Sequence, residues 1–120
     1  MELETVKTLF SMYSGVEETL PYLPLILMSA SELEPQLRSG ADKTDCRLAA
    51  LCAALANVRY VEATAARDRL SHTHAGAVAK NPESAQKLDL ALRLYTQLRE
   101  SCADLLTDSG FSFAAVGKES

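Results

Sequence analysis

The stretch that decides the fold runs from Leu48 to Ala66 and reads LAALCAALANVRYVEATAA. Its first part, Leu48 to Ala56, carries no polar side chain. A surface helix keeps one apolar stripe, whereas a helix that is apolar nearly all round is buried on several sides. Alanine also has the highest intrinsic helix propensity. The stretch therefore predicts the central helix of a small helical protein.

Two long helices are expected around this stretch. Thr44 or Asp45 can cap the first, which we place at 45–70. Asn81-Pro82-Glu83 predicts the start of the second, because asparagine caps, proline suits the first helical position and glutamate faces the positive end of the helix dipole. Apolar residues at three- and four-residue spacing continue that helix over 82–107. We expect the two to form an antiparallel hairpin.

The first 40 residues predict two or three short helices packed on this hairpin. One covers 2–14 and ends at Gly15. Pro21 and Pro24 interrupt the next part. Ser31-Glu32-Leu33-Glu34 matches a capping box, which predicts a new short helix from Ser31 to about Arg38. With 120 residues, the chain is expected to be a single all-α domain over 1–120.

The connector 71–80 reads SHTHAGAVAK and breaks the helical pattern. It is longer than most connections between packed helices, and a short extended segment at 73–78 is possible. Loops of this kind carry function more often than packed elements do. The candidate residues for contact with a partner are therefore those of this loop: His72, Thr73, His74, Gly76 and Val78.

The overall charge and the cysteines limit the classes of function. The net charge is -4 and the pI about 5.1, which argues against non-specific nucleic-acid binding because that needs a basic surface. Three cysteines without regular spacing do not form a disulfide framework and fit a reducing, cytoplasmic setting. The N-terminus does not resemble a signal peptide, and the apolar stretch Leu20 to Met28 is too short to cross a bilayer.

No catalytic, cofactor-binding or metal-ligating residue is expected. His72 and His74 would face the same side of an extended segment, but a zinc site needs at least three protein ligands and no third is apparent. The cysteines lack a neighbouring base, and paired acids such as Glu17-Glu18 are common near helix starts. The arginines of the long helices either pair with acids or form a docking surface for an acidic partner.

The exposed side of the alanine-rich stretch is the main indication of a partner. One hairpin and some short helices are expected to cover it incompletely, and an exposed apolar patch normally marks an interface. We therefore expect protein partners, either in a homo-oligomer or in an assembly with other structural proteins, and no contact with a membrane.

The second half of the chain also carries a sequence resemblance. A long Ala/Leu helix with Tyr60 near its middle is followed by the Ser-x-x-x-Ala-Gly-x-Val segment that starts at Ser71, and a last helix leads to the Leu-Leu-x-Asp-x-Gly-Phe ending at Phe111. This order is similar to small uncharacterised prophage proteins of Firmicutes, and loosely to phage head–tail connector (adaptor) proteins. The resemblance implies a helical structural protein that assembles as a ring, with no catalytic residues, in the cytoplasm or in a virion-like particle.

Three hypotheses follow, in order of preference. The first is a non-enzymatic structural or interaction protein, connector-like, that self-associates. The second is a small cytoplasmic regulatory or adaptor bundle that binds a protein partner or ligand through the cleft beside the central helix. The third is an enzyme or metal protein that uses His72, His74 and a cysteine, and the missing ligands count against it.

Overall fold

The computed structural model describes residues 1–74 and 82–107, and every regular element in these ranges is a helix. The β-type pairing within them is limited to a single bridge between Leu37 and Leu106. The expectation of an all-α protein is therefore confirmed. The tail after Thr107, with its two phenylalanines, lies outside the described residues.

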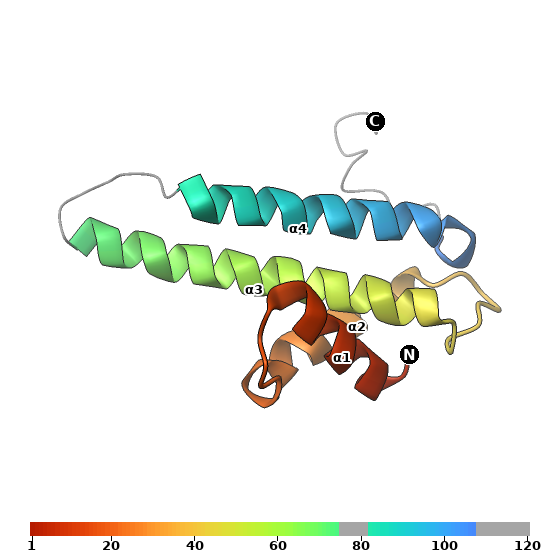
Figure 1. The fold of residues 1–120 in the computed structure, drawn as a ribbon. Coiled ribbons are helices and arrows are strands. Elements are labelled where there is room, and N and C mark those ends of the chain that lie inside the picture. The colour runs from red at the N-terminus through yellow and green to blue at the C-terminus, as the bar shows by residue number, and fades with distance from the viewer. Residues whose placement is uncertain (75–81, 108–120) are drawn as a thin grey trace.

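Helix α3, Cys46–His74, runs through the whole molecule and contacts α1, α2 and α4 (Figure 1). Asp45 caps it, as the sequence suggested: its Oδ1 accepts a hydrogen bond from the backbone N–H of Arg47 at 2.9 Å. The cap fixes the start of the helix one residue later than the predicted start at 45.

The far end of α3 differs from the prediction of a helix over 45–70 and a connector over 71–80. The helix continues to His74, so Thr73 and His74 are helical and not extended. The predicted boundary was wrong because neither glycine nor proline occurs between Leu70 and Gly76, so nothing stops the helix there. The remainder of the predicted extended segment lies outside the described residues.

Helix α4, Pro82–Ser101, lies along α3, and its last turn is next to the first turn of α3 (Figure 1). Arg47 joins these two ends, since its Nη1 donates to the carbonyl of Ser101 at 2.9 Å and to Asp104 at 3.0 Å. The helix begins at Pro82, as predicted.

The prediction that this helix ends at about Thr107 was wrong. The helix ends at Ser101, and a short 3₁₀ turn, η3 (Ala103–Leu105), follows. The chain after Cys102 pairs instead with the distant segment 36–38: Arg38 N–H donates to the carbonyl of Leu105 and Thr107 N–H to that of Gln36, both at 2.8 Å. These long-range hydrogen bonds replace the last helical turns and leave Leu105 and Leu106 buried.

The first 40 residues form α1 (Leu3–Ser14), the 3₁₀ turn η1 (Leu20–Tyr22), α2 (Leu23–Leu33) and a second 3₁₀ turn, η2 (Glu34–Gln36). Gly15, at φ +80°, ends α1 in the left-handed conformation that glycine adopts without strain. Pro24 lies in the first turn of α2, where the missing N–H costs nothing.

The prediction of a capping box at Ser31 was also wrong. Ser31 lies inside α2, which runs without a break to Leu33 and therefore leaves no helix start there. Pro35 explains the end of α2, because it has no backbone N–H to donate to the carbonyl of Ser31 and so interrupts the helical hydrogen bonds. The short helix expected from Ser31 to Arg38 is reduced to η2.

The core lies around the first half of α3. All residues from Leu48 to Val58 are buried except Ala50, which is half-buried. Helices α1, α2 and α4 supply the cover, and Tyr60 extends it through edge-to-face contacts with Phe10 and Tyr22 at centroid distances of 6.0 and 5.1 Å. The first part of the alanine-rich stretch, Leu48 to Val58, is therefore covered by this chain, contrary to expectation, whereas Ala63 and Ala66 further along it are exposed.

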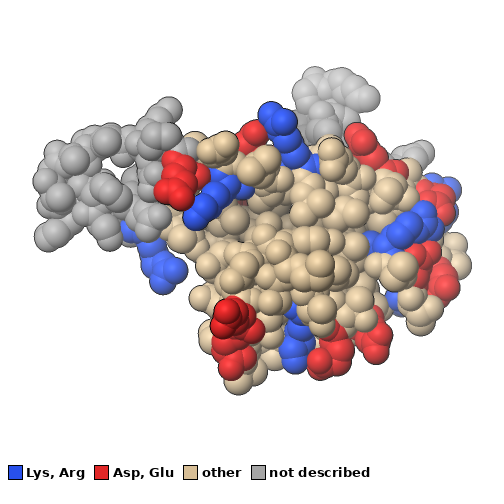
Figure 2. Space-filling model, viewed as in Figure 1, with Lys and Arg blue, Asp and Glu red and all other residues tan. Residues whose placement is uncertain are grey.

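Charged side chains lie mainly around the rim of the face seen in Figure 2, and its middle is largely uncharged. Several of these charges are paired across elements. Arg59 of α3 contacts Glu32 of α2, and Arg47 contacts both Asp45 and Asp104. Such exposed pairs add little stability individually, but they position the helices relative to one another.

Candidate functional site

The partner-contact residues expected from the sequence fall at the far end of α3 and beyond it. His72, Thr73 and His74 have helical backbone, and Gly76 and Val78 lie outside the described residues. The argument that His72 and His74 face the same side assumed an extended segment, so it no longer holds. The assignment of these residues to partner contact stays a prediction.

The cysteines have two different environments. Cys46 is exposed at the start of α3, whereas Cys52 and Cys102 are buried and unpaired by any disulfide. Burial raises the pKa of the Cys52 thiol to about 11 and raises that of Cys102 as well. Both thiols therefore stay protonated near neutral pH, which is typical of small apolar core residues and not of nucleophiles.

Clusters of three or more metal-ligating side chains do not occur among the described residues. The acids that lie close together are held by arginine. Hydrogen bonds from Arg47 lower the pKa of both Asp45 and Asp104, so these carboxylates are ionised and satisfied at neutral pH. Their contacts with Arg47 hold the start of α3 next to the chain that follows α4.

The arginines that suggested a docking surface mostly have partners within the chain. Arg93 pairs with Asp89 at 3.0 Å. Arg99 is only 3% exposed, and it donates to the hydroxyl of Tyr95 at 2.9 Å and to Oε1 of Gln36. These contacts favour the interpretation that the arginines pair internally over that of a surface for an acidic partner.

An exposed apolar surface lies on the outward side of α2. The buried residues Ile26, Ser29 and Leu33 mark the side of α2 that packs inward. At about 100° per residue, positions 24, 27 and 28 fall on the opposite side. We call this surface the outer α2 face; its residues are Pro24, Leu27 and Met28, of which Leu27 and Met28 are 51% and 52% exposed, and Leu20 of η1, which precedes it in the chain, is 66% exposed. In the sequence these residues belong to the apolar stretch Leu20 to Met28, which is too short to cross a bilayer.

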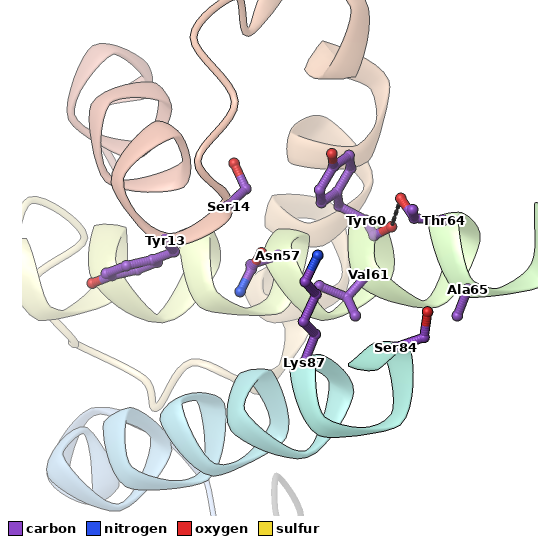
Figure 3. A pocket seen from close by; sticks show the side chains of 9 residues that line it. All are labelled: Tyr13, Ser14, Asn57, Tyr60, Val61, Thr64, Ala65, Ser84 and Lys87. Carbon is purple, nitrogen blue, oxygen red and sulfur yellow. Dashed lines mark hydrogen bonds between the residues drawn. The ribbon is translucent and has the colours of Figure 1, made fainter. Parts of the chain in front are cut away.

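A cavity of about 250 Å³ lies where the end of α1, the second half of α3 and the start of α4 meet (Figure 3). Tyr13 and Ser14 come from α1, Asn57 and Tyr60 from α3, and Lys87 from α4. Figure 3 shows the Lys87 side chain extending from α4 toward Asn57. The sequence contained one signal for this site, namely the single amide in the otherwise apolar run from Leu48 to Val58.

Two further findings concern membrane spans and similarity to known proteins. In the part of the chain that the structure describes, no helix has the length and apolar character needed to cross a membrane. Comparison with models of protein families, with curated proteins and with solved structures gives no significant match.

Proposed function

We propose that the protein is a non-enzymatic structural or interaction protein that self-associates through its outer α2 face. The scaffold would be the antiparallel hairpin of α3 and α4, with the short N-terminal helices packed on it. The observation that carries the proposal is the exposure of Leu27 and Met28, both more than half accessible although the core beneath them is already complete. Clustered apolar side chains that the chain leaves uncovered are typical of interfaces.

The nature of this surface favours a second copy of the chain as its occupant. The segment Leu20 to Ser31 contains no charged residue. Two identical copies can therefore meet at its centre without placing like charges opposite each other, as an interface between identical surfaces requires. Leucine and methionine supply the transfer free energy on burial, roughly 25 cal/mol per Å² of apolar area.

The stoichiometry separates two forms of this proposal. If the outer α2 face packs on its own copy, the contact closes at a dimer. A connector-like ring, which the sequence resemblance implies, needs a head-to-tail contact between two different surfaces. Leu90 and Leu92 of α4 are 57% and 43% exposed, but they point about 200° apart around the helix, so only one of them could belong to such a second surface.

The experiment is sedimentation velocity over a concentration series, with the wild type beside the double variant Leu27→Glu/Met28→Glu. We expect concentration-dependent association of the wild type and a monomer for the variant. Met12→Glu is the matched control, because Met12 is also an exposed apolar residue but lies on α1. Circular dichroism checks that each variant keeps its helix content.

Two results would contradict the proposal. If the wild type stays monomeric at the highest accessible concentration, the proposal of self-association is ruled out. An oligomer that survives the α2 variant but dissociates in the Met12 control places the interface elsewhere.

A further inference from the structure

We propose that the cavity between α1, α3 and α4 is a binding site for a small organic carboxylate that also carries an N–H or O–H donor. Lys87 would pair with the carboxylate, and the carboxamide of Asn57 would hydrogen-bond the rest of the polar group. This proposal does not depend on self-association, because the cavity and the outer α2 face have no residue in common.

The first observation is the burial of Asn57. It is 5% exposed, and its Oδ1 is buried with no hydrogen-bond partner. Leaving a buried amide oxygen unsatisfied costs on the order of 1–3 kcal/mol, and leucine at this position would avoid the cost. Among the residues Leu48 to Val58, Asn57 is the only one with an amide, hydroxyl or charged side chain. Asn57 also lines the cavity, so a ligand bound there could satisfy this oxygen once the carboxamide turns it toward the cavity.

The second observation is the position of Lys87. It reaches the cavity from α4, and its ammonium lies toward Asn57 (Figure 3). Its ion pair with Glu83 is long, at 3.9 Å, and both side chains are mostly exposed, so the pair holds Lys87 weakly. Of the described residues that line the cavity, Lys87 alone is charged. The site therefore has a net positive lining and selects an anion.

The remaining lining limits the ligand further. Ser14 and Thr64 already use their hydroxyls within the chain: each donates to a backbone carbonyl four residues earlier, at 2.7 and 2.9 Å. Val61 and Ala65 add apolar wall on the α3 side. A ligand thus meets one cation, one amide, the phenol rings of Tyr13 and Tyr60, and apolar wall, which fits a carboxylic acid with a compact aliphatic or aromatic body.

The size of the cavity also counts. Sites for drug-sized ligands occupy about 300–1,000 Å³, and a volume of about 250 Å³ falls below that range. A molecule of the size of an acylated amino acid fits, whereas a nucleotide does not. The terminal torsion of asparagine is broad and roughly two-fold, so the carboxamide can turn its oxygen toward a donor on such a ligand.

The test is a titration of ¹⁵N-labelled protein followed by NMR with three matched probes. N-acetyl-L-leucine carries both the carboxylate and the N–H, N-acetyl-L-leucinamide lacks the charge, and 4-methylpentanoate lacks the N–H. We expect N-acetyl-L-leucine to shift the side-chain amide signals of Asn57, and each of the other probes to bind at least about tenfold more weakly, as expected for the loss of one good hydrogen bond or ion pair.

Variants assign the two contacts. Lys87→Gln should weaken the binding of N-acetyl-L-leucine by about tenfold, so that the site no longer prefers it over the uncharged N-acetyl-L-leucinamide. Arg93→Gln, which removes an exposed cation from the same helix, should leave binding unchanged. Asn57→Leu should also weaken binding while it raises the midpoint of thermal unfolding, a combination that a purely structural asparagine does not produce.

The outcomes that overturn the proposal are equally specific. If none of the three probes shifts the resonances of the cavity residues at millimolar concentration, the proposed binding site is ruled out. If N-acetyl-L-leucine and N-acetyl-L-leucinamide bind with equal affinity, and Lys87→Gln leaves that affinity unchanged, the site does not recognise a carboxylate. A drop in the unfolding midpoint of Asn57→Leu shows that Asn57 serves the fold.

Discussion

At the scale of single residues, Cys52 gives a prediction with a defined pH window. Its thiol is buried in the core, and burial raises its pKa from 9.0 to about 11. In the unfolded chain the thiol ionises near pH 9, while in the folded protein it stays protonated. The unfolded state then binds fewer protons, so the stability is fully present below pH 9 and is lost as the pH rises toward 11. The loss is on the order of 2 kcal/mol.

The measurement is the free energy of unfolding in urea, taken between pH 8 and pH 11. Cys52→Ala should show a shallower decline than the wild type, whereas Cys46→Ala, at an exposed position, should follow the wild type. Tyr13 and Cys102, whose pKa values burial also raises, contribute in the same direction in all three proteins. Equal slopes for wild type and Cys52→Ala would show that this thiol is accessible to water.

At the scale of elements, local signals identified most of the helices but not all of their ends. Leu48 to Ala56 indicated a buried helix, and Pro82 marked the start of another, because both depend on composition and capping within one segment. The end of α4 depends instead on hydrogen bonds from Arg38, more than sixty residues away, and no periodicity contains that information. Asn57 was visible as an interruption of the apolar run, but its cavity needs Lys87 from another helix.

Ser31 tests the most instructive of these errors, since its two interpretations predict opposite signs. As the first residue of a capping box, Ser31→Ala would cost about 1 kcal/mol of stability. As an exposed residue inside α2, the same change should stabilise the protein by about 0.5 kcal/mol, because alanine has the higher helix propensity. Urea denaturation distinguishes the two, and a destabilised Ser31→Ala would place a helix start at this residue.

At the scale of the whole molecule, Arg38 joins segments from the two halves of the chain. Its guanidinium donates to the carbonyl of Leu106 at 2.9 and 3.2 Å, beside the bridge between Leu37 and Leu106. We expect Arg38→Ala to lower the free energy of unfolding by about 1–2 kcal/mol, the cost of leaving a part-buried carbonyl without its charged donors. Arg93→Ala, which breaks an exposed pair with Asp89, should change it by less than about 0.5 kcal/mol. Equal effects of the two variants would show that this connection adds no stability.

The charges that flank the outer α2 face decide how self-association should respond to salt. Glu17 and Glu18 precede the uncharged segment, Glu34 follows it, and all three are exposed. Two copies that pack there bring acids of both chains together, so their repulsion opposes the apolar contact. Because the screening length falls from about 30 Å at 0.01 M to about 10 Å at 0.1 M salt, we expect association to strengthen as NaCl rises over this range. Sedimentation equilibrium measures the change, and Glu17→Gln/Glu18→Gln should associate more tightly at low salt and respond less to NaCl. Association that weakens with salt would instead indicate attraction between opposite charges of the two copies, and would contradict an apolar contact flanked by like charges.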